Sequence, residues 1–150
     1  MGDDAAEATA WYVDAGRLRV EAAQALLKGK HGLDACANGL RVAGCRCGGG
    51  GGGQTCAPVD PVQVGRLCAV NAAQLFEPTR HFGRQMSSYA LKHIVERSGL
   101  TPEGGWPRGG HPYWSNGAFI LYMVSEGFEV EPVSAGDSPN AFVKCKPKRE

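Results

Sequence analysis

Residues 115–127 read SNGAFILYMVSEG, and six consecutive apolar residues within this stretch run from Phe119 to Val124. Ser115 is of the type that caps helix N-termini, and Gly127 is of the type that accepts the left-handed turn after a helix. The stretch therefore predicts a short helix. Because this helix has no polar face, we expect it to be buried in the core.

A second capped segment, residues 87–99, precedes this helix. Ser87 and Gly99 stand at its two ends and again predict a helix start and a helix stop. The wheel of residues 88–98 places four residues on the side expected to face the core. These are Leu91, Ile94, Val95 and Ser98.

Two strand-like segments close the chain, at residues 128–133 and 141–146. Residues 134–140 join them and are rich in turn-forming types, so the pair predicts a β-hairpin. We therefore expect a helix–helix–hairpin core over about residues 80–146.

An N-terminal helix is predicted for residues 4–28, with Gly29 just past its end. Apolar side chains recur there at helical spacing, and a stripe of this kind usually faces the core. The stripe consists of Ala8, Trp11, Ala15, Leu18, Ala22 and Ala25. Gly16 inside the segment costs about 1 kcal/mol relative to Ala and leaves open a break into two helices.

Residues 29–59 lose this periodicity and include an unbroken glycine run at 48–53. Glycine buries no side chain and loses the most backbone entropy on folding, so a flexible loop is expected. Asp60 and Pro61 then predict a helix start, and this helix should end before Pro78. The pattern as a whole predicts one small, mostly helical α+β domain over residues 1–150, with a C-terminal β-hairpin and a disordered Cys/Gly-rich loop.

Composition argues against two classes of partner. The chain has 150 residues, of which 21% are charged, and its net charge is +1, so no strong field favours nucleic acid or a membrane surface. No apolar run approaches the ~20 residues that a membrane helix needs. The N-terminus lacks the pattern of a secretory signal. We therefore expect a cytoplasmic protein without a membrane partner, with reduced cysteines.

Four cysteines in the 29–59 segment form a candidate zinc site with the spacing C-x8-C-x-C-x8-C. They are Cys36, Cys45, Cys47 and Cys56. Four thiolates can hold Zn²⁺ tetrahedrally, but zinc knuckles usually contain C-x2-C pairs, which are absent here. Cofactor binding is therefore not expected, and a small structural zinc protein ranks third among the functions. The other two cysteines, Cys68 and Cys145, are expected to be small core residues.

Catalysis is not predicted. His81, His93 and His111 are scattered, and no thiol or hydroxyl lies in a recognisable nucleophile motif. We expect no enzyme and name no catalytic residue.

Two segments carry residue types that dominate binding surfaces, namely Trp, Tyr and Arg with neighbouring basic groups. The outward face of residues 88–98 is predicted to present Tyr89, Lys92, His93 and Arg97. The loop at 104–114 adds Trp106, Arg108, His111, Tyr113 and Trp114. For Trp106 and Trp114 the alternative is packing into the core, which would hold the loop down.

These surfaces predict a non-enzymatic accessory protein that binds a macromolecule. Nucleic acid is the alternative partner, bound by the basic outer face of helix 88–98 and the C-terminal hairpin, because helix–helix–hairpin is also the order of a winged helix-turn-helix. Against this alternative, 16 residues separate Ser98 from Ser115, far more than a helix-turn-helix allows.

Four short motifs follow one another along residues 80–145. They are Ser88-Tyr89-Ala90-Leu91-Lys92-His93, Tyr113-Trp114-Ser115-Asn116-Gly117-Ala118-Phe119, Gly127-Phe128 and Asn140-Ala141-Phe142. This pattern resembles small uncharacterised bacterial proteins of phages and mobile elements. The resemblance implies a phage or mobile-element source. We expect a host or element protein as partner, which the chain would modulate or inhibit. The resemblance implies no activity.

Overall fold

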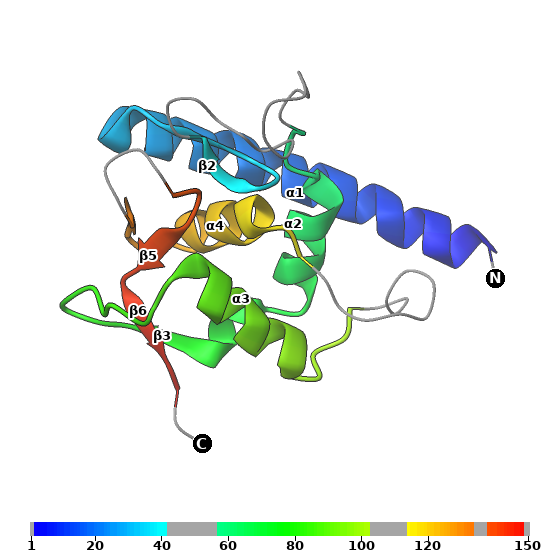
Figure 1. The fold of residues 1–150 in the computed structure, drawn as a ribbon. Helices are drawn as coiled ribbons and strands as arrows, with labels where there is room; N and C mark the ends of the chain where they lie inside the picture. The colour runs from blue at the N-terminus through cyan, green and yellow to red at the C-terminus, as the bar shows by residue number, and fades with distance from the viewer. Residues whose placement is uncertain (1, 42–56, 103–113, 134–137, 149–150) are drawn as a thin grey trace, which may run out of the picture.

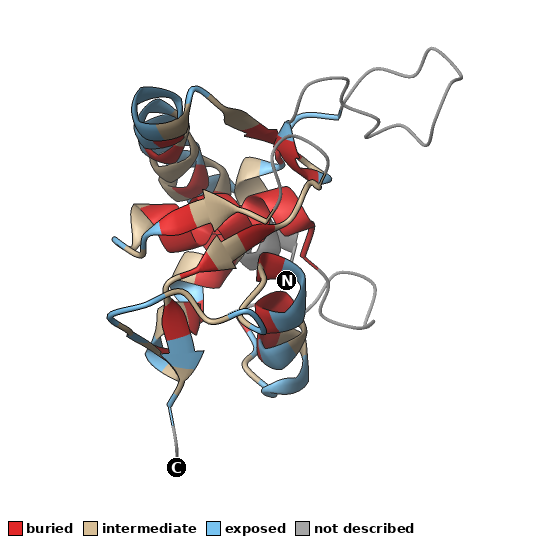
Figure 2. Ribbon diagram, turned by 60° about the vertical axis from the view of Figure 1, so that its left-hand side comes forward, coloured by how far each residue is buried: buried red, intermediate tan, exposed pale blue. Residues whose placement is uncertain are grey.

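The computed structural model describes residues 2–41, 57–102, 114–133 and 138–148 (Figure 1). Helix α4 (Asn116–Ser125) lies at its centre, and the side chains from Ala118 to Met123 are fully buried, as predicted. Its caps are also confirmed, because the Ser115 hydroxyl accepts a hydrogen bond from the Ala118 N–H at 3.2 Å and Gly127 has φ +95°. Figure 2 shows the buried residues gathered on this helix and on the surfaces that face it.

Helix α1 (Gly2–His31) runs along one side of α4 without a break at Gly16. It continues through Gly29 and ends at His31, and the next residue, Gly32, has φ +68°. Arg19 ties it to the end of α4 through an ion pair with Glu126, at 2.8 Å between Nη1 and Oε1. Among the described residues, no helix combines the length and apolar character that crossing a membrane requires.

Helix α2 (Pro61–Ala69) packs across α1 and begins where the sequence predicts. The Asp60 carboxylate accepts a hydrogen bond from the Val62 N–H at 3.0 Å. The helix ends earlier than expected, because Asn71 adopts a left-handed conformation with φ 50°. A short 3₁₀ helix, η1 (Ala72–Leu75), and strand β3 (Phe76–Pro78) then occupy the rest of the predicted helix.

The predicted core face of α1 is wrong. Trp11 and Leu18 are 53% and 69% exposed, whereas the buried side contains Tyr12, Gly16, Ala23 and Leu27. The reason is a close backbone approach between α1 and α2 at two glycines. A Cβ added to Gly16 would collide with the carbonyl oxygen of Pro61, and one added to Gly65 would collide with that of Tyr12. Glycine has no apolar side chain and so does not mark a core face in a sequence pattern. The predicted apolar stripe therefore indicated a different face of α1 from the one that is buried.

Helix α3 (Ser88–Arg97) lies on the other side of α4 from α1. Its predicted caps are confirmed, since the Ser87 hydroxyl accepts a hydrogen bond from the Ala90 N–H and Gly99 has φ +82°. Leu91 and Val95 are buried as expected. Ile94 and Ser98, which were also expected on the core side, are exposed.

The predicted C-terminal hairpin is confirmed in its pairing, though its strands are shorter. Strand β4 (Val130–Pro132) pairs antiparallel with β5 (Ala141–Val143), and Val130 lies opposite Val143. The predicted second strand is interrupted at Lys144. Its last part, β6 (Cys145–Pro147), pairs instead with β3 and so brings the C-terminal segment against residues 76–78.

Cys145 and Cys68 are packed as the sequence predicts. Cys145 is buried in β6, and burial raises the pKa of its thiol to about 12. Cys68 is half-buried on α2 beside the core, and burial raises its thiol pKa to about 11. Both thiols are therefore neutral near pH 7 and act as small apolar side chains.

Residues 29–41, expected to belong to a flexible loop, are ordered. They complete α1 and then form a hairpin in which β1 (Asp34–Cys36) pairs antiparallel with β2 (Gly39–Arg41). Gln24 of α1 fixes this hairpin, because its side-chain amide both donates to and accepts from the backbone of Ala35 at 2.8 Å. The rest of the predicted loop from residue 42 to 56, with the glycine run, lies outside the described residues.

The α1–α2 crossing can be tested by substitution. We expect Gly16→Ala to lower the free energy of unfolding by about 1–3 kcal/mol or more, because the new methyl group would push the two helices apart. Gly29→Ala is the matched control, since nothing lies within 4 Å of a Cβ there and the substitution should stabilise α1 by about 0.5–1 kcal/mol. Urea unfolding followed by circular dichroism measures both. Equal stability of the two variants would contradict the close approach.

Candidate binding site

A polar cleft of about 460 Å³ lies between α3, the start of α4 and two turns of the chain. We call it the α3 cleft. Its lining residues are Ala37, Asn38, Tyr89, Lys92, His93, Glu96, Asn116, Pro139 and Asn140. Three of them, Tyr89, Lys92 and His93, are residues that the sequence predicts for binding. The fold therefore brings three of the four residues of one predicted surface together with polar groups from distant segments.

The carboxylate of Glu96 organises one wall of the cleft. Its Oε2 lies 3.3 Å from Lys92 Nζ, and its Oε1 lies 3.0 Å from His93 Nδ1. The backbone N–H of Trp114 also donates to Oε2 at 3.1 Å. Because the Lys92 and Glu96 side chains are only 6% and 12% exposed, water screens this pair weakly. Glu96 therefore fixes α3 to the residue just before the α4 N-cap.

The prediction that Lys92 points outward is wrong, since its ammonium group is buried against Glu96 and lies 5.4 Å from the ring centroid of Tyr89. Tyr89 itself is 53% exposed and meets His93 edge to face, with 4.5 Å between ring centroids. Arg97 is exposed as predicted but does not line the cleft. The outer face of α3 is thus more aromatic and less basic than its sequence indicates.

Asn116 connects the cleft to the turns that surround it. Its Nδ2 donates to the carbonyl oxygen of Asn38 at 3.1 Å, to that of Pro139 at 3.3 Å and to Oδ1 of Asn140 at 2.9 Å. Its Oδ1 is buried and has no hydrogen-bond partner among the described residues. A buried acceptor without a donor costs free energy, so this amide orients the turns rather than adding much stability.

The other predicted site residues do not join the cleft. Trp114 is fully buried beside α4, which corrects its placement on a binding surface and agrees with the core alternative. Trp106, Arg108, His111 and Tyr113 lie outside the described residues.

The predicted zinc site is not placed by the structure. Cys36 is buried in β1, and Cys45, Cys47 and Cys56 lie outside the described residues. Within the described parts of the chain, no three His, Cys, Asp or Glu side chains gather as metal ligands would.

Three lysines on α3 and in the C-terminal segment form ion pairs with carboxylates. Lys144 Nζ lies 3.3 Å from Glu129 Oε2, and Lys146 Nζ lies 3.2 Å from Glu77 Oε1. Together with the buried Lys92, these contacts neutralise three lysines that a nucleic-acid surface would use. Arg80, Arg84 and Arg97 stay exposed.

Sequence reasoning missed Glu96, Asn116 and Asn140 as site residues. Glu96 interrupts the basic face in the sequence, although its spacing of four from Lys92 and three from His93 places it next to both on a helix. Asn116 and Asn140 are 24 positions apart and meet through the fold, so no local pattern indicates their contact.

A second candidate surface is the exposed apolar face of α1. Five large apolar side chains are exposed among the described residues, and three of them lie on this helix. Trp11, Leu18 and Leu26 are 53%, 69% and 59% exposed and are spaced seven and eight residues apart, which places them on one face. We call these three residues the α1 stripe.

Comparison with protein-family models, with curated proteins and with solved structures finds no match to this chain.

The role of Glu96 yields a prediction. Glu96→Ala leaves the buried Lys92 without its carboxylate, so we expect the free energy of unfolding to fall by about 3 kcal/mol. Asp14→Ala removes the carboxylate of an exposed pair with Arg17 and should change it by less than about 0.5 kcal/mol. Urea unfolding of the two variants measures the difference. A loss below about 1 kcal/mol for Glu96→Ala would contradict the anchoring role.

Proposed function

We propose that this protein is a non-enzymatic accessory protein that binds a partner protein through the α1 stripe. The observation that carries the proposal is the exposure of Trp11, Leu18 and Leu26 on one helix face. Apolar side chains aligned on one exposed helix face are found at protein–protein contact surfaces, and Trp is enriched among the residues that dominate binding energy. The buried face of α1 is already occupied by α2 and α4, so this outer face is available to a second molecule.

The α3 cleft is a second, smaller contact region in this proposal. Tyr89 offers an exposed ring, and His93 is held beside it by Glu96. Because α1 and α3 lie on opposite sides of α4, substitutions in one surface leave the other intact (Figure 1). Modulation of a host protein by a phage or mobile-element product stays a prediction from the sequence resemblance.

Nucleic-acid binding is the alternative, and the exposed Arg80, Arg84 and Arg97 favour it. The pairing of Lys92, Lys144 and Lys146 with carboxylates argues against it, because a paired lysine releases few counterions from phosphate. The protein-binding proposal is therefore preferred.

A capture experiment with matched variants tests the proposal. Tagged protein is incubated with bacterial lysate, and retained proteins are quantified by mass spectrometry for the wild type, for Trp11→Gln/Leu18→Gln and for Glu21→Gln. We expect the double variant to retain at least about tenfold less of a specific partner protein than the wild type, because it lacks two residues that anchor the interface. The exposed Glu21→Gln control should retain as much of this partner as the wild type. A Tyr89→Ala variant reports separately on the α3 cleft.

Two outcomes would contradict the proposal. Equal retention by the double variant and the control would exclude the α1 stripe as the binding surface. Capture that disappears after nuclease treatment, and that falls steeply between about 50 and 200 mM salt, would establish the nucleic-acid alternative instead.

A further inference from the structure

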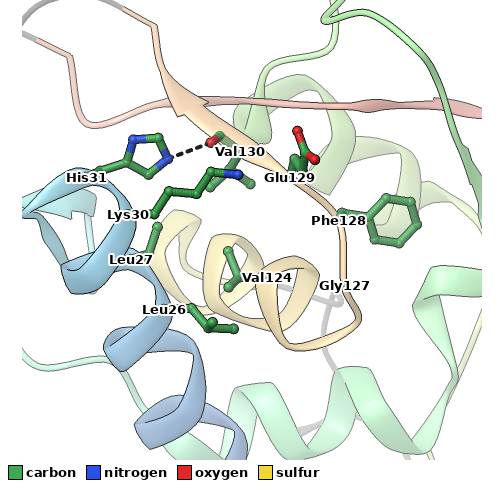
Figure 3. A pocket seen from close by; sticks show the side chains of 9 residues that line it. All are labelled: Leu26, Leu27, Lys30, His31, Val124, Gly127, Phe128, Glu129 and Val130. Carbon is green, nitrogen blue, oxygen red and sulfur yellow. Dashed lines mark hydrogen bonds between the residues drawn. The ribbon is translucent and has the colours of Figure 1, made fainter.

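An apolar pocket of about 200 Å³ lies where the C-terminal end of α1 meets the end of α4 and strand β4 (Figure 3). It shares no residue with the α3 cleft. Leu27, Val124 and Val130 are buried in its wall, and Leu26 extends from α1 into solvent at its edge. The wall is therefore built from three separate elements that the fold holds together.

The size of the pocket limits what can enter it. A cavity of about 150 Å³ lined by aliphatic side chains accommodates a benzene molecule. At about 200 Å³, this pocket accommodates a phenyl ring or a branched alkyl group of similar volume.

The charged side chains at the rim of the pocket differ in whether they form an ion pair. Figure 3 shows the Lys30 side chain extending from the end of α1 toward β4, above Leu27 and Val124. Among the described residues, no carboxylate forms an ion pair with Lys30, whereas Glu129 on the opposite rim is paired with Lys144 at 3.3 Å. His31 is held by Val130, whose carbonyl oxygen lies 2.9 Å from its Nε2. The rim therefore presents one ammonium group beside an apolar wall.

We propose that this pocket binds a small carboxylate with an apolar tail of about phenyl size. The tail occupies the space between Leu27, Val124 and Val130, and the carboxylate pairs with the ammonium group of Lys30. Apolar burial supplies most of the affinity, and the ion pair selects the anion over neutral analogues. The site shares Leu26 at its edge with the α1 stripe, whereas its buried wall and Lys30 lie outside that surface.

Nuclear magnetic resonance titration tests this proposal. The probe is 3-phenylpropionate, and its neutral analogue 3-phenylpropanamide is the matched ligand. We expect saturable shifts of the methyl signals of Leu26, Leu27, Val124 and Val130, with a Kd on the order of 1 mM for a ligand of this size. Methyl signals of Val64 and Val95, which are buried elsewhere, should not move. The amide should bind more weakly than the acid.

Two variants separate the contributions. Lys30→Gln should weaken 3-phenylpropionate binding about two- to fivefold, as loss of an exposed ion pair does, while Lys28→Gln should leave it unchanged. Val124→Phe fills the pocket and should abolish binding, with unchanged Val64 and Val95 signals as the check that it folds. Absence of saturable shifts at about 10 mM acid, or equal binding of acid and amide, would overturn the proposal.

Discussion

The contact between Gly16 of α1 and Gly65 of α2 constrains how the rest of this chain packs. With no Cβ at either position, the two backbones approach until the carbonyl oxygens of Pro61 and Tyr12 occupy the space that side chains would fill. This contact fixes which side of the 30-residue helix α1 faces inward. It turns Ala23 and Leu27 toward α4, and it leaves Trp11, Leu18 and Leu26 in solvent. The proposed protein-binding surface is therefore a direct consequence of a backbone contact on the opposite face.

Close backbone approaches at two other glycines shape the region around the α3 cleft. A Cβ on Gly117 would collide with the carbonyl oxygen of Cys36, and one on Gly39 would collide with that of Pro139. These approaches seat the β1–β2 hairpin on the start of α4, where the Gly117 N–H donates to the Ala37 carbonyl oxygen at 3.1 Å. Asn116 then reaches both turns with one amide group. Close packing at glycines thus positions both the cleft and the core helix beneath it.

The sequence predicted correctly those features that depend on residues close together in the chain. The capped helices at α3 and α4, and the burial of the apolar run in α4, follow from residues within one element. The buried face of α1 depends on the other helix that crosses it, and the order of residues 29–41 depends on Gln24 and Pro139. Lys92 was expected in solvent because a helical wheel does not show that Lys92 and Glu96 are buried as a pair. The predicted stripe of α1 was wrong as a core face, because the direction in which α1 faces depends on its contact with α2.

The packing of this chain depends on the α1–α2 crossing, and a nuclear Overhauser effect between an Hα proton of Gly16 and the amide proton of Gly65 measures that crossing most directly. A Cβ in place of one Gly16 Hα would lie 2.9 Å from the Gly65 nitrogen, so the two protons must be close and the cross-peak strong. A strong cross-peak, together with contacts from Pro61 to Gly16, is the result we predict. Cross-peaks from α2 to Trp11 and Leu18 instead would show that the opposite face of α1 is buried, and would contradict the account.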